Sequence, residues 1–555
     1  MVNTTSKSFW CLRYIKSMYK RIVIFFSLFM LSISLLILKI YSISDGGWLC
    51  DAAANQSTYR LDVAKLRGTI YDCRLNPMTG IKKTNVAAVF PCIESEMALD
   101  RIIKDDQRKD VFNMQSSGQP FKINIDKNDI NCPYINVFRV PVRYTEDPLA
   151  VHIIGYIDEA GKGVCGIEDS YNDYLSNTGS CISVKYKVDA LDRVLEGENI
   201  KVEDKSYLDT KGVVLTLDTR LQQISEKAAK RYIKKGAVII SEVPTCKIRA
   251  CVSVPDYCPN DIEKYLNSED CPLLNRAFCA YNVGSIFKLV TAATALENGL
   301  SKDYRYNCTG SIKVDDTDFN CFNGKGHDNI DMKEAIAYSC NSYFVNVSDK
   351  ITGEQILNMS RKLGFGSLSE LAPNMFSKKG NLPTQESLKD KKTMANFSFG
   401  QGTLLATPIQ ISGLINTIAS DGKYCSPSLV EGLVNENLQF IKKYNDRLQA
   451  RVISENTAKC LKDFMRASIE EGTSVKGKPQ NGDAGAKTST AETGIQIDGK
   501  NVIQAWYAGF YPFEKPKYSI VVLAEDAVGG GGSCGPVFKQ IIDDIYNEMP
   551  GALLS

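Results

Sequence analysis

The chain has 555 residues, which is enough for two or three domains with sizeable hydrophobic cores. Its 66 basic and 64 acidic residues give a formal net charge of +2, so no basic excess indicates nucleic-acid binding. Only two histidines occur, His152 and His327, which argues against histidine-based catalysis and against a metal site built from several histidines.

An uncharged apolar run at residues 22–38 has close to the length of a membrane span, about 17 to 25 residues. The residues before it include five cations and no acid. The positive-inside rule then predicts a cytoplasmic tail (1–21), one transmembrane anchor (22–43) and export of the rest of the chain. A cleaved signal peptide is the alternative, but the run is long for one, and GWLC (47–50) is a poor lipid-attachment motif.

Eighteen cysteines occur, and all but Cys11 follow the predicted anchor. The remaining odd number cannot all pair within the chain, and no CxxC spacing supports a zinc knuckle or an iron–sulfur site. We therefore predict no metal site and no cofactor. Disulfides in an oxidising exterior and free thiols in an anaerobic one both fit this composition, and we favour mostly free thiols.

Residues 44–208 are predicted to form a β-rich pedestal domain. Short β-like runs such as YINVFRVPVRY (134–144) and ISVKYKV (182–188) occur among polar segments. GKGVCGIEDSYNDYL (161–175) is typical of a glycine turn followed by a short helix.

Residues 209–555 have the pattern of one α+β domain. A strand is predicted to end at Leu217, and Asp218 then caps an amphipathic helix that Gly236 ends. GAVIISEV (236–243) and KIRACVSV (247–254) are predicted to be antiparallel strands joined by a turn. Further along, Asp331 and Glu334 fit a capping box for another helix.

The C-terminal end of this segment contains two more predicted strands and a final helix. The strands are QAWYAGFYP (504–512) and KYSIVVLAED (517–526), and the helix covers residues 536–549. Because strands occur at both ends of the segment, we predict that they share one sheet.

GSIFKLVTAATALENG (284–299) is apolar on most sides and ends in glycine, which predicts a helix buried in the domain centre. Ser285 and Lys288 are three residues apart, so their side chains share one face. The free N–H groups of a helix N-terminus favour developing negative charge beside Ser285. A desolvated lysine can lose its proton near neutral pH, so this pair is a candidate nucleophile and base.

Short motifs of this kind are weak signals when they occur singly. Ser-x-x-Lys recurs in the basic tail at residues 17–20, and Ser-x-Asn occurs at 339–341 and again at 454–456. Three motifs in a fixed order are far more specific. GSIFK (284–288), SCN (339–341) and KTST (487–490) resemble the three signatures of penicillin-recognising serine transferases.

The resemblance covers nearly everything after the predicted anchor. LLNRAF (273–278), SFGQGTLLATPIQIS (398–412) and AWYAGFYPFEKPKYSIVV (505–522) resemble the transpeptidase domain of that family. RGTIYDCR (67–74) resembles the RGxIxDR signature of class B penicillin-binding proteins. The implied fold is α+β: a serine β-lactamase/transpeptidase-like domain with an antiparallel sheet flanked by helices, after a β-rich pedestal and one N-terminal transmembrane helix.

The resemblance also implies a role for each motif residue. Ser285 would attack the carbonyl of the penultimate D-alanine of a peptidoglycan stem peptide. Lys288 would be the base, and Ser339 would relay a proton to the leaving amine. An amine on a neighbouring stem peptide would then take the acyl group, and β-lactams would acylate the same serine.

Substrate binding would fall to the second and third motifs. Asn341 would hold the substrate amide, and Lys487 and Thr488 on an edge strand would bind the terminal carboxylate. The backbone N–H groups of Ser285 and Thr490 would form the oxyanion hole, which supplies a large share of such catalysis.

Other outcomes of the same chemistry stay open. A D,D-carboxypeptidase would use water in place of the acceptor amine, and a non-catalytic scaffold of the wall-synthesis complex would keep the fold alone. No glutamate suited to deacylating a β-lactamase is identified. No glycosyltransferase motif precedes the domain, so a SEDS-type glycan polymerase in the same bacterial cytoplasmic membrane is the expected partner.

One motif position departs from the family pattern, because Ser489 stands where glycine is usual. A serine side chain there must point away from the cleft, crowd it or add a hydrogen bond. If Thr488 faces the substrate, strand alternation places Ser489 on the opposite face, where the helix layer would supply any crowding. We expect an active enzyme with altered β-lactam affinity.

Four further features are interpreted as structural. His327 is predicted to be a loop residue near the second motif, and Cys340 a small packing residue. GGGGSCG (529–535) is predicted to be a flexible connection, and Arg67 and Arg74 to serve the pedestal fold or a partner interface.

Overall fold

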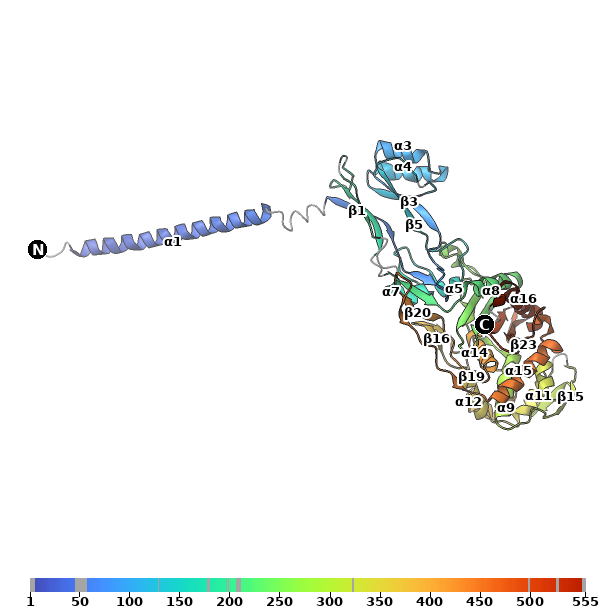
Figure 1. Ribbon diagram of the computed structural model, residues 1–555. Helices are drawn as coiled ribbons and strands as arrows, with labels where there is room; N and C mark the ends of the chain where they lie inside the picture. Colours follow the sequence, from blue (N-terminus) through green and yellow to red (C-terminus); the bar gives the residue numbers. More distant parts are fainter. Residues whose placement is uncertain are drawn as a thin grey trace. The chain divides into compact units, whose positions relative to one another are not determined.

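The computed structural model of the chain describes residues 5–44, 57–127, 129–176, 180–195, 197, 199–205, 211–321, 324–497, 500–525 and 529–551. The chain divides into two compact units, each built from several stretches of sequence (Figure 1). Unit 1 comprises Met1–Lys65, Thr84–Val140 and Cys181–Ser206. Unit 2 comprises Leu66–Lys83, Pro141–Ser180 and Tyr207–Ser555.

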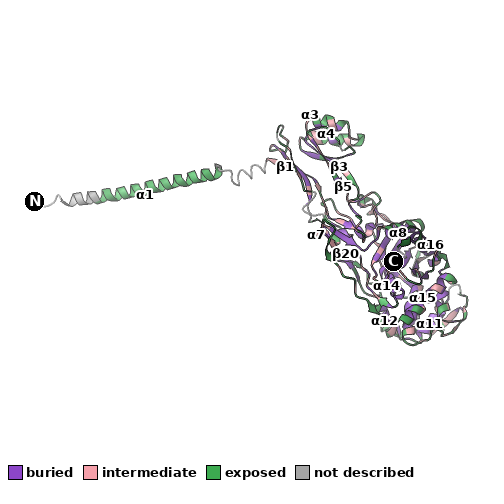
Figure 2. Cartoon of the chain, in the orientation of Figure 1, coloured by how far each residue is buried: buried purple, intermediate pink, exposed green. Residues whose placement is uncertain are grey.

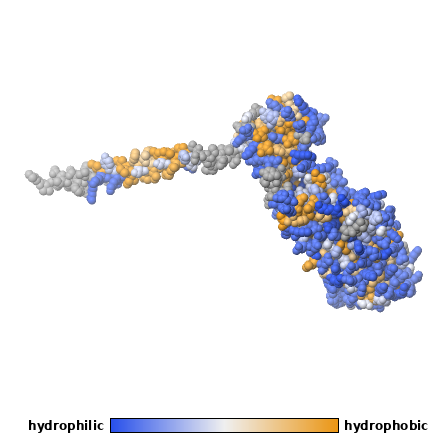
Figure 3. Space-filling model, viewed as in Figure 1, coloured by the Kyte–Doolittle hydropathy of each residue, from blue (hydrophilic) through white to orange (hydrophobic). Residues whose placement is uncertain are grey.

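Unit 1 begins with the long helix α1, Thr5–Ser44. Its stretch Arg13–Ile43 is long and apolar enough to cross a membrane, and every side chain in that stretch is exposed. Figure 3 shows the hydrophobic side chains along this helix. The predicted apolar segment is therefore one helix, in the form that a single-pass anchor or a signal sequence takes.

The rest of unit 1 is β-rich, with sheets of order β1-β6-β7 and β4-β3-β5. Helices α3 and α4 share a hydrophobic core with the second sheet. The strands predicted within residues 134–144 and 182–188 are confirmed as β5 and β6. The bounds are β1 Thr58–Lys65, β3 Lys83–Val89, α3 Ile93–Asp100, η1 Asp105–Gln107, α4 Arg108–Ser116, β4 Phe121–Ile125, β5 Ile135–Pro141, β6 Cys181–Lys187 and β7 Lys201–Asp204.

A five-stranded antiparallel sheet of order β10-β9-β25-β24-β23 forms the centre of unit 2. Strands from the two ends of the domain are neighbours in it, because β9 pairs with β25 from Glu242↔Tyr518 to Gly236↔Ala524. The predicted shared sheet is confirmed, and β23 is its edge. The bounds are β9 Gly236–Glu242, β10 Ile248–Val254, β23 Gly485–Ile497, β24 Lys500–Tyr511 and β25 Tyr518–Ala524.

Helices cover both faces of this sheet, as the alternating side chains of β25 demonstrate. Val521 and Leu523 join one hydrophobic core with α9, α14 and α15, whereas Ile520 and Val522 join another with α8 and α16. Figure 2 shows the buried residues of these layers in purple. The bounds are α8 Thr219–Tyr232, α9 Lys288–Glu297, α14 Pro408–Ala419, α15 Glu455–Glu470 and α16 Gly535–Glu548.

Unit 2 also contains shorter helices and two-stranded sheets. The helices are α5 Val151–Ile154, α6 Gly166–Ser170, α7 Asn172–Ser176, α10 Met332–Ala337, α11 Asn341–Ser348, α12 Gly353–Lys362 and α13 Lys391–Ser398. The short 3₁₀ or π turns are η2 Ile262–Tyr265, η3 Arg276–Phe278, η4 Gly284–Phe287, η6 Ser387–Lys389, η7 Val475–Gly477 and η8 Gly530–Cys534. The strand pairs are β11 Tyr281–Asn282 with β18 Leu405–Ala406, β12 Tyr306–Cys308 with β15 Asp328–Ile330, β13 Ser311–Val314 with β14 Thr317–Asn320, β16 Ser369–Ala372 with β17 Met375–Ser377, and β19 Lys423–Tyr424 with β22 Ala450–Arg451.

A second sheet of unit 2, β2-β8-β20-β21, joins early and late parts of the chain. Strand β2 (Thr69–Tyr71) lies parallel to β8 (Gly212–Leu215), which also pairs with β20 (Val430–Val434); β21 covers Phe440–Lys443. Residues 66–83 and 141–180 therefore group with the C-terminal segment in unit 2.

The two arginines of RGTIYDCR tie these segments together. Arg67 Nε donates to Glu168 Oε2 at 2.6 Å, and Arg143 Nε donates to Oε1 of the same carboxylate at 2.6 Å. Glu168 is fully buried, so its charge is compensated by two guanidinium groups. Arg74 forms an ion pair of 2.7 Å with Asp218, the N-cap of α8. Both arginines thus make structural contacts within unit 2.

Most local predictions hold, and two need correction. Asp218 caps α8, and Asp331 and Glu334 form the predicted capping box of α10. Helix α8 ends at Tyr232 rather than at Gly236, which is already the first residue of β9. The glycine run is not a flexible connection: η8 is a π turn, and Gly530 packs against the backbone of β23 and β24.

Candidate active site

The candidate nucleophile lies in a turn that leads into the central helix. Residues 284–299 form the 3₁₀ turn η4 followed by α9, so the single helix predicted there is divided just before Lys288. Ser285 is half-buried, and Lys288 is completely buried in the core. The spacing of three residues brings the side chains together as predicted, because Lys288 Nζ donates to Ser285 Oγ at 3.0 Å.

The second motif meets the same amino group. Lys288 Nζ also lies 2.7 Å from the carbonyl oxygen of Ser339, 3.1 Å from Ser339 Oγ and 2.7 Å from Asn341 Oδ1. Ser339 has a left-handed backbone (φ 59) in the turn between α10 and α11, which is what lets both its carbonyl and its hydroxyl face the lysine. A second hydrogen bond fixes the side chain of Asn341, because its Nδ2 donates to Asn320 O at 2.9 Å.

Burial controls the protonation of this lysine. Loss of hydration disfavours the ammonium form and lowers the pKa of Lys288 to about 8. Four oxygen atoms surround Lys288 Nζ, which is more than the three protons of an ammonium group can serve. A neutral amine also finds partners here, because it can donate two hydrogen bonds and accept one from a hydroxyl group. A lysine with this pKa can accept the proton of Ser285 near neutral pH.

The third motif lies on the edge strand β23. Lys487 is fully buried, and its Nζ donates to Thr488 O at 2.9 Å. Burial, and then the nearby charge of Lys288, lower the pKa of Lys487 well below its usual value. Thr488 Oγ1 donates to Thr473 Oγ1 at 2.8 Å, and Thr490 is exposed. The alternate N–H groups of an edge strand face away from the sheet, where a substrate strand can pair with them.

Ser489 points to the opposite face of the strand from Thr488. It is buried, and its hydroxyl donates to the carbonyl oxygen of Val283 at 2.7 Å. Of the three arrangements considered from the sequence, two are therefore observed together: the side chain points away from the face of Thr488, and it adds a hydrogen bond.

A cluster of three thiols and one imidazole lies directly beside the second motif. The ligand atoms of Cys308, Cys321, His327 and Cys340 all lie within 4.8 Å of one another. Cys321 Sγ lies 3.6 Å from both Cys308 Sγ and Cys340 Sγ, and Cys308 Sγ lies 3.5 Å from His327 Nδ1. These sulfur–sulfur separations are too long for a disulfide bond, which is about 2.05 Å.

The geometry of this cluster fits a tetrahedral metal ion. A zinc ion with Zn–S distances near 2.3 Å separates its sulfur ligands by about 3.7 Å, and three cysteines with one histidine are a common structural donor set. A hydrogen bond from Cys340 lowers the pKa of the Cys321 thiol well below its usual value, which favours the thiolate that a metal requires. The backbone N–H of Ser342 also lies 3.5 Å from Cys321 Sγ.

The sequence did not predict this cluster, because its members are 13, 6 and 13 residues apart and form no CxxC pair. Cys308 is the last residue of β12, Cys321 follows β14, His327 precedes β15 and Cys340 is the N-cap of α11, so the folded chain brings together residues of separate elements. His327 is in a loop as predicted, and Cys340 is buried as predicted, but both lie in this cluster. The sixteen cysteines whose side chains the structure describes are all free.

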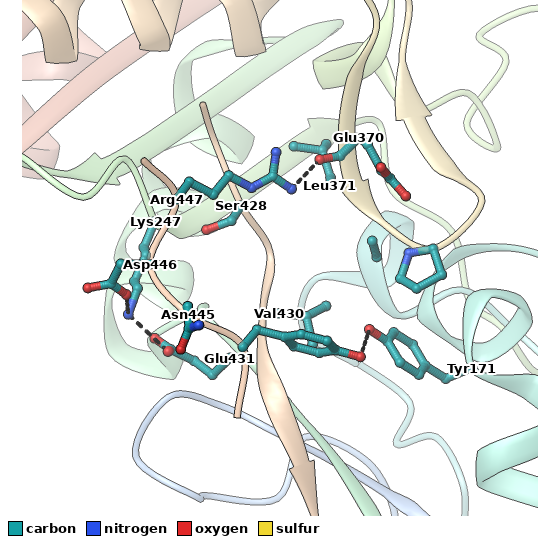
Figure 4. A pocket seen from close by; sticks show the side chains of 13 residues that line it. Tyr171, Lys247, Glu370, Leu371, Ser428, Val430, Glu431, Asn445, Asp446 and Arg447 are labelled. Atoms are coloured by element: carbon teal, nitrogen blue, oxygen red, sulfur yellow. Dashed lines mark hydrogen bonds and ion pairs between the residues drawn. The ribbon is translucent and has the colours of Figure 1, made fainter. Parts of the chain in front are cut away.

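A cavity of about 320 Å³ lies apart from the three motifs, lined by residues of β16 and β20, by Tyr171 between α6 and α7, and by residues 444–447 (Figure 4). Two tyrosines, Tyr171 and Tyr444, form one wall, with their hydroxyl oxygens 3.4 Å apart. Lys247 pairs with Glu431 at 3.0 Å, and Arg447 donates to backbone and hydroxyl oxygens. Lys247 is thus already ion-paired, and Arg447 is hydrogen-bonded to neutral oxygens.

The arrangement around Lys288 suits serine acyl transfer without a histidine, because a half-buried hydroxyl, a buried amine, a second hydroxyl and an amide are in direct contact. Residues 236–543, more than half of the chain, match the family described as penicillin binding protein transpeptidase domain. The chain belongs to this family, and its relatives are class B penicillin-binding proteins.

Three relatives illustrate how similar the chain is to proteins of this family. The chain is 30% identical to peptidoglycan D,D-transpeptidase PbpA of Mycolicibacterium smegmatis over 57% of its own length and 67% of the relative's. It is 26% identical to stage V sporulation protein D of Bacillus subtilis over 72% of its length and 62% of the relative's. It is 26% identical to peptidoglycan D,D-transpeptidase MrdA of Acinetobacter baumannii over 72% of its length and 65% of the relative's.

Solved structures share the fold. Penicillin-binding protein 2 of Helicobacter pylori, in complex with MreC, matches with a TM-score of 0.65, 21% identity and coverage of 89% of this chain and 99% of that one. Penicillin-binding protein 3 of Mycobacterium tuberculosis, in complex with aztreonam, matches with a TM-score of 0.64, 20% identity and coverage of 89% and 97%. The predicted α+β fold with a β-rich N-terminal region is confirmed.

Proposed function

We propose that this protein is a peptidoglycan D,D-transpeptidase, which cross-links stem peptides through an acyl-enzyme on Ser285. The observation that carries the proposal is the direct contact of Lys288 Nζ with Ser285, Ser339 and Asn341 in a buried site. A scaffold without catalysis would have no need to keep a lysine desolvated beside a serine.

The acylation step follows from these contacts. Neutral Lys288 takes the proton of Ser285 while Oγ forms a bond to the carbonyl carbon of the penultimate D-alanine. The tetrahedral oxyanion then collapses and the C–N bond breaks. The leaving D-alanine amine takes a proton from Ser339, whose hydroxyl regains one from the Lys288 ammonium. No metal or organic cofactor takes part in this step.

Substrate binding is assigned to the residues around this pair. Asn341 would hold the substrate amide, and Lys487 and Thr488 would bind the terminal carboxylate. The N–H groups of Ser285 and Thr490 would stabilise the oxyanion. In the second half-reaction, an amine of a neighbouring stem peptide attacks the acyl carbon and Ser285 leaves with its proton restored. β-Lactams, which imitate the D-Ala-D-Ala end, would acylate Ser285 in the same way.

The cysteine–histidine cluster is assigned a structural zinc ion. Cys308, Cys321, His327 and Cys340 would fill all four positions, so the ion has no open site for water or substrate. Its contribution would be to hold the turn that carries Ser339 and Asn341, because Cys340 lies between them.

The setting of the reaction is assigned from helix α1 and the family. Residues 22–43 would anchor the protein in a bacterial cytoplasmic membrane by a single pass, with residues 1–21 in the cytoplasm and the catalytic domain outside. The pedestal region would position that domain, and a SEDS-type polymerase in the same membrane would supply glycan strands.

Analysis of the cell wall by mass spectrometry after depletion of the protein tests this proposal. Loss of cross-linked muropeptides would support transpeptidation. An increase in uncross-linked pentapeptides, with cross-linking retained, would instead indicate a D,D-carboxypeptidase. A scaffold role predicts that a Ser285→Ala chain restores cross-linking to depleted cells as well as the wild type does.

A further inference from the structure

The hydroxyl of Ser489 joins the third motif to the segment that leads into the nucleophile. Its Oγ donates to Val283 O at 2.7 Å, and the side chain is 2% exposed. Val283 lies two residues before Ser285, and Ser489 lies one residue before Thr490. A glycine, which is usual in the family at this position, has no side chain to make this bond.

Strand β24, which pairs with β23, makes the same kind of contact with Asn282, one residue before Val283. Trp506 is the cross-strand partner of Ser489, and its Nε1 donates to Asn282 O at 2.8 Å. Asn282 N in turn donates to Gln504 Oε1 at 2.7 Å. Two consecutive carbonyls before the nucleophile are thus held by side chains of β23 and β24, so the separation between sheet and turn is fixed by direct bonds.

The turn has little room to move away from this position. Gly284 has a left-handed backbone (φ +58), and a methyl group added there would clash with Ser489 Oγ and lie 3.1 Å from Ala491 Cβ. On its other side, Gly284 N donates to Gly400 O at 3.0 Å, and Gly400 also has no space for a side chain. The Ser489 hydroxyl fills the gap between the strand and the turn, which a glycine would leave open.

We infer that Ser489 is a positioning residue for the acylation step, which holds β23 and the Ser285 turn at a fixed separation. The inference rests on the proposed function. The two oxyanion donors assigned there lie on opposite sides of this bond: Ser285 N–H on the turn and Thr490 N–H on the strand. Preorganised donors stabilise the oxyanion only when their spacing matches it, so the bond acts on the transition state.

This role predicts a particular kinetic signature. The hydroxyl is buried and already bonded to the backbone, so it contributes little to the noncovalent capture of a β-lactam. Its loss removes the one of these bonds that lies nearest Ser285 and loosens the spacing between the strand and the turn there, which weakens oxyanion stabilisation and lowers the acylation rate constant. Ser489 therefore affects the rate of acylation far more than the dissociation constant of the preceding complex.

Saturation kinetics with a fluorescent penicillin, on the full chain in detergent, separate these two constants. Ser489→Ala removes the bond, whereas Ser489→Thr keeps a hydroxyl on the same strand face. Thr493→Ala is the matched control, because it removes a side-chain bond of 2.9 Å that joins β23 to Val502 O of β24 rather than to the segment before Ser285. Thermal unfolding of each variant reports whether the fold is intact.

We expect Ser489→Ala to lower the acylation rate constant by about 10- to 100-fold, with the dissociation constant within about twofold of the wild type. Ser489→Thr should recover most of the rate, and Thr493→Ala should leave both constants unchanged. An unchanged or faster rate in Ser489→Ala, with acylation of the wild type intact, would overturn this inference alone. Absence of acylation in the wild type would overturn the proposed function, and this inference with it.

Discussion

The amino group of Lys288 lies 2.7 Å from the side-chain oxygen of Asn341, so the first and second motifs are joined by a direct hydrogen bond. The same amino group reaches Ser285 and Ser339. One desolvated amino group thus contacts the polar side chains of the first two motifs. In the proposed mechanism, its protonation state would set the rate of acylation.

Acylation should depend on pH through Lys288. Burial lowers the pKa of Lys288 to about 8, and the neutral amine is the form that accepts the proton of Ser285. The second-order rate constant for acylation by a β-lactam should therefore rise about tenfold per pH unit below the pKa and level off above it. Stopped-flow measurement from pH 6 to 10 tests this. A rate that is independent of pH over this range would show that Lys288 is not the base.

Asn341→Asp should shift that pH profile. The substitution keeps the shape of the side chain but places a negative charge 2.7 Å from Lys288 Nζ. An adjacent carboxylate favours the ammonium form and raises the pKa of Lys288 by about 1 to 3 units. Acylation near pH 7 should fall, and raising the pH to about 10 should recover much of it. Asn341→Ala is the control, because it weakens substrate binding without adding a charge. A profile with the wild-type midpoint in Asn341→Asp would contradict the assignment.

The purified chain should contain one zinc ion. Elemental analysis of protein prepared without chelators should find about one zinc per chain, and removal of the ion should lower the unfolding temperature by several degrees, about 5 °C or more. Cys321→Ser should lose the metal, because Cys321 is a member of the cluster. Cys271→Ser is the matched control, because Cys271 is exposed and lies outside the cluster. The zinc site would be refuted if the wild-type protein contained no metal and its unfolding temperature did not change on addition of zinc or chelator.

Glu168→Ala should destabilise unit 2 without removing any residue of the candidate active site. The substitution leaves Arg67 and Arg143 as unpaired cations, with side chains only 7% and 14% exposed. Breaking such a buried pair typically costs about 3–5 kcal/mol of unfolding free energy. Denaturant unfolding measures this loss. Glu455→Ala is the comparison, because its ion pair with Arg451 is exposed and worth less than about 1 kcal/mol. Equal losses in the two variants would show that the buried network is not a main stabilising feature.

The residues that the sequence located best are those whose partners are close in the chain. Ser285 and Lys288 meet because of helical spacing, and Asp331 with Glu334 forms a cap over three residues. The antiparallel strands of the central sheet were predictable from apolar runs bounded by turns. These features depend on local geometry, which a sequence pattern records directly.

The features that the sequence did not reveal depend on distant contacts. The cysteine–histidine cluster forms only when the ends of two small strand pairs meet the N-terminus of α11, and its spacing matches no short metal motif. Residues 66–83 join unit 2 through the parallel pairing of β2 with β8, which lies more than 130 residues further along. The glycine run at 529–535 was predicted to be flexible, yet its small residues allow a π turn to pack tightly against β23.

The most direct test of the central claim is labelling of the full chain with a fluorescent penicillin, followed by mass spectrometry of the labelled peptide. We predict one stoichiometric adduct, on Ser285, which is lost in Ser285→Ala and greatly slowed in Lys288→Met. A wild-type chain that stays unlabelled under conditions where a known penicillin-binding protein reacts, or an adduct that persists in Ser285→Ala, would contradict the account.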